Sequence, residues 1–171
     1  MKNPFTQIVA ALFMAIVSTH AENPPAPTGI TEPFLHVTLS ASVAGIVTAR
    51  RFKEGDTVRE GQPILELDKT LEEIETARRG VIADEKKRDY DSTALLYEKT
   101  KSVSKEDLLK KESDYKVAVA ERDIAAEQLR RRIITAPFTG QITDILVESG
   151  EACQPYQPIV RVVDTSRCYF V

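Results

Sequence analysis

The sequence predicts an α+β protein: a flattened β-barrel or sandwich built from two related half-motifs, with an antiparallel coiled-coil helical hairpin inserted between them. The first observation is that a β-type segment recurs 95 residues further along the chain. Its first copy begins at Ala41 and its second copy begins at Ala136. A second is that no proline lies between Ile64 and Ala136, an interval in which nearly every second residue is charged and Gly80 is the single glycine. Because helices tolerate few prolines and glycines, we expect this interval to be helical.

The composition limits the kind of protein. A chain of 171 residues can form one ordinary domain, or two small ones that share a core. Its 23 Lys plus Arg against 26 Asp plus Glu give no basic field that would attract a nucleic acid. Tryptophan is absent and aromatic residues are scarce, which argues against a large aromatic-lined ligand pocket.

The N-terminus indicates export. Lys2 precedes an apolar run over residues 8–17 and a group of small residues that ends at Ala21, so residues 1–21 are predicted to be a signal peptide. The run is much shorter than the ~20 residues that cross a bilayer, although an uncut signal would hold the protein at the inner membrane. Residues 22–33, which include "ENPPAPTG", are expected to be a linker because they are rich in proline.

The two copies of the repeat have the pattern of small β units. In the first copy, a strand is followed by a tight turn at Gly55, a short strand through Val58, a turn at 62–63 and a last strand over 64–67. One copy alone is too small to bury its apolar face, so we expect two copies to close on each other about a pseudo-twofold axis. The positions identical in both copies are Ala41 and Ala136, Gly45 and Gly140, Thr48 and Thr143, Gly55 and Gly150, Gln62 and Gln157, Pro63 and Pro158, and Ile64 and Ile159.

Both copies resemble the half-motifs of the biotinyl/lipoyl fold, and "EGDTVREGQPILELD" carries the resemblance most clearly. The predicted lipoyl-like halves are residues 34–68 and 134–164. Carrier domains of that fold modify a lysine at the tip of the turn that joins the halves, and Lys69 stands close to that place. A carrier domain modified at Lys69 is therefore the alternative function, although helical sequence follows the lysine where a tight turn would be needed.

Two capping signals define the predicted hairpin, residues 69–133. Thr70 and Glu73 fit a capping box at its first helix, and Ser104 and Asp107 fit a second box after a turn near residues 100–103. In the second arm the expected contact seam has coiled-coil spacing. It consists of Leu108, Tyr115, Val119, Ala126, Leu129 and Ile133. In the first arm we expect two runs with a register shift near Gly80. These are Leu71, Ile74 and Val81, followed by Ala83, Tyr90, Ala94 and Tyr97.

The order of half-motif, helical hairpin and half-motif resembles that of the periplasmic adaptor proteins, also called membrane fusion proteins, of tripartite efflux pumps and type I secretion systems. The resemblance covers residues 32–171, and "LYEKTKSVSKEDL" resembles the hairpin tip of the family. Residues 165–171 resemble the first strand of the family's β-barrel domain, which would be truncated here. The resemblance implies a non-enzymatic periplasmic protein that bridges an inner-membrane transporter and an outer-membrane channel and packs against copies of itself.

In that family the hairpin tip contacts the channel through a pattern of Arg, Leu and Ser. When the pattern is aligned on Ser104, Thr93 and Tyr97 stand where Arg and Leu are expected, and a shift by one residue brings in Leu96 instead. The partner-binding residues that the resemblance implies are Thr93, Tyr97, Lys101, Val103 and Ser104. A coiled-coil interaction module unrelated to transport is a third hypothesis.

Other chemistry has few candidate residues. His36 is the one histidine outside the predicted signal peptide, and a metal site needs several converging ligands. We find no catalytic set, phosphate loop or cofactor motif. Cys153 and Cys168 are expected to be two buried thiols, because each stands in apolar, strand-like sequence. The alternative is that they pair in a disulfide after export to an oxidising compartment.

Overall fold

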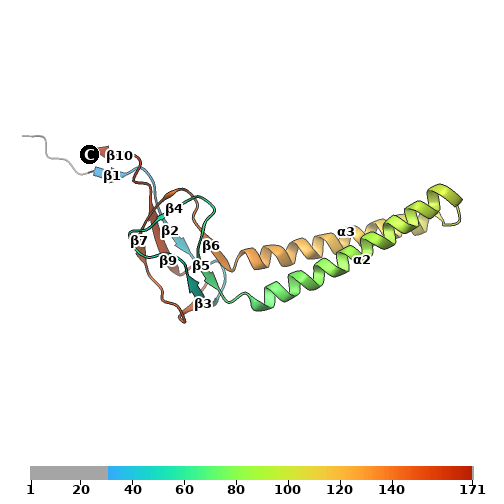
Figure 1. The fold of residues 1–171 in the computed structure, drawn as a ribbon, viewed down its shortest axis with the longest axis horizontal. Coiled ribbons are helices and arrows are strands. Elements are labelled where there is room, and N and C mark those ends of the chain that lie inside the picture. Colours follow the sequence, from blue (N-terminus) through green and yellow to red (C-terminus); the bar gives the residue numbers. More distant parts are fainter. Residues whose placement is uncertain (1–30, 171) are drawn as a thin grey trace, which may run out of the picture. The chain divides into compact units, whose positions relative to one another are not determined.

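The structure is a computed structural model and describes residues 31–170. Within these residues, ten strands and two long helices follow one another, with both helices between the fifth and sixth strands (Figure 1). The predicted signal peptide, residues 1–21, lies outside the described residues. The strands are β1 (Thr31–Pro33), β2 (His36–Ser40), β3 (Gly45–Arg50), β4 (Thr57–Val58), β5 (Pro63–Leu67), β6 (Ile133–Thr135), β7 (Gly140–Ile145), β8 (Ala152–Cys153), β9 (Pro158–Val163) and β10 (Cys168–Phe170).

Two four-stranded sheets form the part of the molecule that we call the β body, β2 to β9. One sheet has the order β2-β9-β7-β4 and the other β6-β5-β3-β8. The repeat relates β2 to β6, β3 to β7, β4 to β8 and β5 to β9, and this exchange converts the first order into the second. The two copies of the internal repeat are thus related by a pseudo-twofold axis, and each sheet contains two strands from each half. The predicted α+β architecture of two closed half-motifs is confirmed.

Hydrogen bonds between the halves follow the same symmetry. Gly55 donates its N–H to the carbonyl of Ile142 at 2.8 Å, and Gly150 donates to that of Val47 at 2.8 Å. Gly55 and Gly150 have φ values of 90° and 91°, a left-handed conformation that glycine adopts without steric cost. The repeated glycines of the sequence therefore mark the turns at which each half bonds to the other.

A second pair of turns explains the repeated glutamines. The side-chain oxygen of Gln62 accepts a hydrogen bond from the Arg59 N–H at 3.0 Å, and that of Gln157 accepts one from the Gln154 N–H at 2.8 Å. Each glutamine thus closes its own turn. The residue before Gln62 is glycine, whereas the residue before Gln157 is Tyr156, which is 86% exposed and has φ 64°.

The core lies between the two sheets and draws on both halves. Its largest fully buried side chains are Ile64, Leu65, Leu67, Ile142, Ile159, Val47, Val58, Val147, Val160 and Val162. Removing this branched apolar surface from water is the main force that holds the halves together. Neither half contains the whole set, so the β body needs both.

Two features differ from the sequence predictions, one in the predicted linker and one at Cys168. Strand β1 lies inside the predicted linker, residues 22–33, because its residues pair antiparallel with β10. Phe34 supports this ribbon by packing on Tyr169, with ring centroids 5.5 Å apart. Cys153 is buried as expected, but Cys168 is exposed because it lies in this two-stranded ribbon outside the core. Both are free thiols.

The inserted segment is an antiparallel helical hairpin formed by α2 (Thr70–Thr100) and α3 (Lys105–Arg130). At 1.5 Å per residue, the 31 residues of α2 extend over ~46 Å. The hairpin extends away from the β body, so the turn at residues 101–104 is its far end (Figure 1). The predicted capping box at Thr70 is wrong: Asp68 instead accepts hydrogen bonds from the N–H and the hydroxyl of Thr70, at 3.2 and 2.9 Å.

Candidate functional site

The two helices meet along a continuous seam in which buried or half-buried residues alternate at spacings of three and four. This spacing keeps one stripe of each helix facing its partner. In α2 the seam consists of Glu72, Thr76, Arg79, Ala83, Lys86, Tyr90, Thr93 and Tyr97. In α3 and the residues after it, the seam consists of Leu108, Lys111, Tyr115, Ala118, Arg122, Ala125, Leu129 and Arg132.

This seam corrects two sequence predictions. Leu71, Ile74 and Val81, expected in the seam, are 77%, 61% and 66% exposed, and the seam passes Gly80 without a register shift. In α3, Ala125 is buried where Ala126 was expected. The apolar pattern identified six seam residues correctly, namely Ala83, Tyr90, Tyr97, Leu108, Tyr115 and Leu129. It failed at the base of α2 because the seam positions there are the polar residues Glu72, Thr76 and Arg79.

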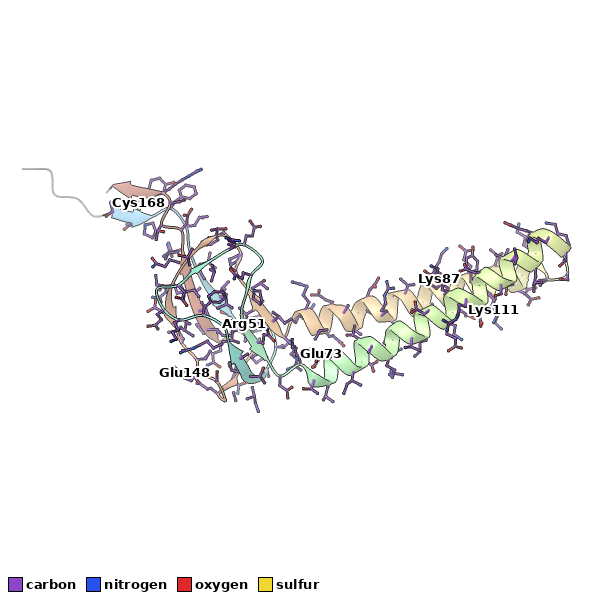
Figure 2. The ribbon with its side chains drawn as sticks, in the orientation of Figure 1. Arg51, Glu73, Lys87, Lys111, Glu148 and Cys168 are labelled. Carbon is purple, nitrogen blue, oxygen red and sulfur yellow. The ribbon has the colours of Figure 1, made fainter. Side chains whose placement is uncertain are left out.

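Specific side chains fix the register of the helices. The rings of Tyr90 and Tyr115 stack with their centroids 6.2 Å apart. Lys111 pairs with Asp89, with the ammonium nitrogen 3.1 Å from the carboxylate. Figure 2 shows Lys111 and other charged side chains along both helices. Shifting the helices by one turn would break these contacts, so they select one alignment.

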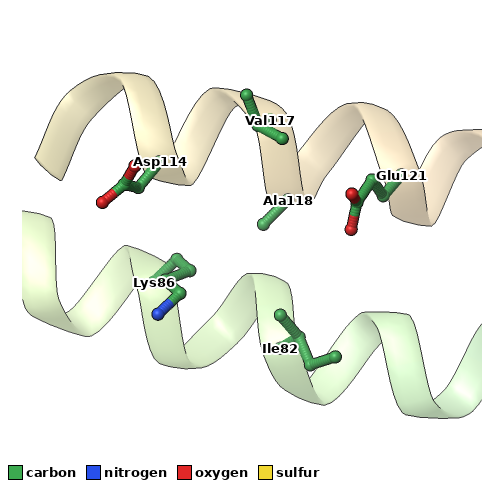
Figure 3. Close-up of a pocket in the computed structure, with 6 residues that line it drawn as sticks. All are labelled: Ile82, Lys86, Asp114, Val117, Ala118 and Glu121. Atoms are coloured by element: carbon green, nitrogen blue, oxygen red, sulfur yellow. The ribbon is translucent and has the colours of Figure 1, made fainter. Parts of the chain in front are cut away.

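Small seam residues leave a shallow groove along the hairpin. Figure 3 shows Ala118 of α3 pointing toward α2, with Val117 beside it pointing away. The groove is lined by Ile82, Lys86, Asp114, Val117, Ala118 and Glu121. Its charged rim and alanine floor do not offer the enclosed apolar cavity that small ligands usually occupy.

The hairpin tip, residues 93–104, is closed by hydrogen bonds within the turn. Helix α2 ends at Thr100, and the next residue, Lys101, caps it in the left-handed conformation with φ 52°. Helix α3 begins after Ser104, whose hydroxyl accepts a hydrogen bond from the Asp107 N–H at 3.0 Å and donates one to the Asp107 carboxylate at 2.6 Å. The predicted cap at Ser104 is confirmed, with the carboxylate bonded to the serine hydroxyl.

The predicted partner-binding residues occupy different positions at this tip. Thr93 and Tyr97 are half-buried seam residues, and the Thr93 hydroxyl donates to the Asp89 carbonyl at 2.8 Å. The Lys101 ammonium lies 4.3 Å from the centroid of the Tyr97 ring, so these two side chains form one unit. Ser104 is exposed, and Val103 is half-buried.

Two apolar residues at the tip were not among the predicted contacts. Leu95 is 51% exposed and Leu96 is 47% exposed. The spacing of the seam could have identified them, since Thr93 and Tyr97 face α3 and the residues between them must point elsewhere. The alternative alignment of the tip pattern, which shifts it by one residue, does select Leu96.

Lys69 does not have the surroundings of a carrier lysine. Its ammonium lies 2.9 Å from the Glu66 carboxylate and 3.3 Å from that of Glu73, just before the first residue of α2. Hydrogen bonds to Glu66 and then Glu73 raise the pKa of Lys69, which favours the charged form. Acylation requires the neutral amine on an exposed turn, whereas Lys69 leads directly into a helix.

From residue 31 to residue 170, no group of three or more His, Cys, Asp and Glu side chains is arranged to hold a metal ion. Over that range, neither helix has a stretch apolar and long enough to cross a membrane.

Comparison with known proteins assigns the class. The family model of the barrel-sandwich hybrid domain of RND membrane fusion proteins matches residues 36–165. The chain therefore belongs to the RND membrane fusion protein family, which confirms the resemblance inferred from the half-motifs and the hairpin.

The chain is also similar to individual proteins and solved structures. An uncharacterized protein of Haemophilus influenzae is 27% identical over 139 residues, which cover 81% of this chain and 36% of the relative. A putative efflux transporter from Bacteroides eggerthii superposes with a TM-score of 0.70 at 22% identity, over 88% of this chain and 51% of that one. A MacA-MexA chimera that carries the MexA α-hairpin domain of Pseudomonas aeruginosa gives 0.75 at 24% identity, over 82% and 51%.

At these identities the two structural matches concern the fold. The chain spans 36% of the length of the Haemophilus relative and about half of each of the two superposed structures, 51% in both cases.

Proposed function

We propose that this chain is a periplasmic, non-enzymatic adaptor subunit of a transmembrane efflux or secretion complex. It bridges an inner-membrane transporter and an outer-membrane channel, and the hairpin tip is the part that contacts the channel. The transporter supplies the energy, and the adaptor spans the distance to the channel and connects the two.

The observation that carries this proposal is the hairpin itself. Two helices of 31 and 26 residues are mounted on a compact β body and end in a capped turn with exposed Leu95 and Leu96 beside it. A long arm with charged sides and apolar residues near its end is suited to reaching a protein partner. The family assignment supports the same role, since its model matches both halves and the hairpin between them.

An exposed stripe on α2 supports self-association within such a complex. Leu71, Ile74 and Val81 lie at helical spacings of three and seven and are all more than half exposed. A hairpin with an apolar stripe outside its own seam has surface available for packing against a second copy. We propose that these residues face a neighbouring subunit.

The tip can be tested with the double substitution Val103→Asp and Ser104→Asp. Aspartate is itself a favoured N-cap, so helix α3 keeps its start while the tip gains two negative charges. We expect the variant to retain its helical circular dichroism signal and to lose assembly with the channel, measured by co-purification from the cells that produce the complex.

The matched control is Ser92→Asp with Ala120→Asp, which adds the same charge at exposed positions along the arms. This control should assemble normally. Photo-crosslinking from position 103 should additionally join the chain to an outer-membrane channel protein. Unchanged assembly of the tip variant, or a tip crosslink to a protein other than a channel, would exclude the proposed contact.

A further inference from the structure

The helices of the hairpin make few direct contacts with the strands of the β body. The two helices pack chiefly on each other, and within residues 31–170 no strand makes a broad contact with either helix. The chain crosses the junction twice, at residues 68–70 and at residues 131–132. Polar contacts at these crossings must therefore set the direction of the hairpin.

Arg132 connects more of this junction than its neighbours do. Its side chain donates to the Glu72 carboxylate from Nε and Nη2, at 3.0 and 2.6 Å, and Nη1 donates to the Ala44 carbonyl at 2.8 Å. Its own carbonyl accepts the Leu67 N–H at 2.8 Å. One residue thus joins the first turn of α2, the loop between β2 and β3, and the end of strand β5.

The Arg132 contacts are sheltered from solvent. The side chains of Arg132 and Glu72 are 23% and 18% exposed, whereas Arg130 and Glu127, an ion pair two residues earlier, are 74% and 41% exposed. Exposed pairs contribute little because water and salt screen them, and a shielded pair that shares further hydrogen bonds constrains its surroundings more strongly.

Gly45 provides the space that the guanidinium needs. A Cβ placed on Gly45 would lie 2.9 Å from Nη1 of Arg132 and 3.3 Å from the Cβ of Leu67. Because Gly45 has no side chain, the guanidinium of Arg132 can lie directly beside its backbone. Gly140 is its counterpart in the second half, and a Cβ placed there would instead collide with the carbonyl oxygen of Val163.

We infer that Arg132 is the positioning residue of the helical hairpin: by joining Glu72 to the Ala44 carbonyl, it fixes the angle between the hairpin and the β body. Without it, the hairpin stays folded along its own seam but pivots about the two crossings. This inference goes beyond the adaptor proposal, because it concerns the isolated chain and needs no partner.

The test measures the angle directly by double electron–electron resonance on the purified chain. Spin labels are placed at the exposed positions Glu60 in the β body and Asp91 on α2, after Cys153→Ala and Cys168→Ser. The parent should give one narrow distance distribution. Arg132→Gln should broaden this distribution while the helical circular dichroism signal is unchanged.

Further variants sharpen the test. Glu72→Ala should broaden the distribution as Arg132→Gln does, and the double variant should be no broader than either single one, because both changes remove the contact between Glu72 and Arg132. Gly45→Ala should also broaden it by displacing the guanidinium. Arg130→Gln, which removes an exposed pair from the same segment, should stay as narrow as the parent.

A narrow distribution in Arg132→Gln would overturn the inference, as would equal broadening in Arg130→Gln. If Arg132→Gln does not fold, Glu72→Ala decides in the same way. Because no transporter or channel is present in this measurement, its failure leaves the adaptor proposal untouched, and loss of tip binding in cells does not bear on the angle.

Discussion

The placement of Ala125 and Ala126 gives a sharp test of the hairpin seam. Ala125 is 5% exposed and faces α2, while the next residue, Ala126, is exposed. Replacing either alanine with leucine adds an isopropyl group to the same helix and leaves helix propensity almost unchanged. The two variants therefore differ in little except the face on which the group is added.

At Ala125 the added group must enter a filled seam, and overpacking of this kind costs about 1–3 kcal/mol. The groove beside Ala125, which Arg79 and Ile124 also line, can take part of the group, so we expect a value near the lower end. Ala126→Leu should change the free energy of unfolding by no more than about 0.5 kcal/mol, as surface substitutions usually do.

Urea unfolding followed by the helical circular dichroism signal measures both values. The midpoints can be compared if the free energy of unfolding falls equally steeply with urea concentration in the parent and in both variants. The seam would be refuted if Ala126→Leu destabilised the chain as much as Ala125→Leu or more, since that result would restore the register that the sequence pattern first indicated.

Three other predictions use the same unfolding measurement. The Thr76 hydroxyl is buried without a hydrogen-bond partner among the described residues, so Thr76→Val should stabilise the chain by about 1 kcal/mol, and a loss of stability would contradict this. Tyr156→Gly should be stabilising by up to about 1 kcal/mol, because Tyr156 has the left-handed φ that Gly61 adopts freely, and an unchanged midpoint would show the strain to be negligible. Arginine hydrogen bonds lower the pKa of Glu75 and of Glu127 to about 2, so both carboxylates stabilise the fold above about pH 4.5 and lose this effect as the pH falls toward 2. Replacing both glutamates with glutamine should flatten the fall in stability between these pH values, and an equally steep fall would exclude them as its source.

The β body was predictable because its turns depend on a few residues with definite backbone roles. Gly55 and Gly150 have left-handed backbone conformations, and Gln62 and Gln157 close equivalent turns. The residues that recur in the sequence are therefore the ones that determine where the turns lie. The exchange of strands between the two sheets was not predictable, because local pattern does not say which strand lies beside which.

The seam was harder to predict for a physical reason. Periodic apolar residues mark a surface that becomes covered, but they do not identify what covers it. Leu71, Ile74 and Val81 have the expected spacing yet lie outside the seam. The contact between α2 and α3 depends instead on alanines that permit close approach and on pairs such as Lys111 and Asp89.

Some features of the hairpin tip could be predicted from the sequence and others could not. The Ser104 cap could be recognised because a capping box is a local pattern of a few residues. The exposure of Leu95 and Leu96 depends on the rotation of α2 about its axis, which only contact with α3 fixes. Tyr97 was expected in the seam and lies there, whereas the half-buried position of Thr93 could not be known before the seam was placed.

The chain leaves strand β5 and returns in strand β6, and these strands are direct neighbours in one sheet. The Leu67 N–H and the Arg132 carbonyl, on either side of the inserted helices, are 2.8 Å apart. The whole arm thus stands where a short loop between adjacent strands would suffice. Helical turns can consequently be added to or removed from both arms in matched numbers, which would change the span of the molecule while the sandwich beneath keeps its pairing.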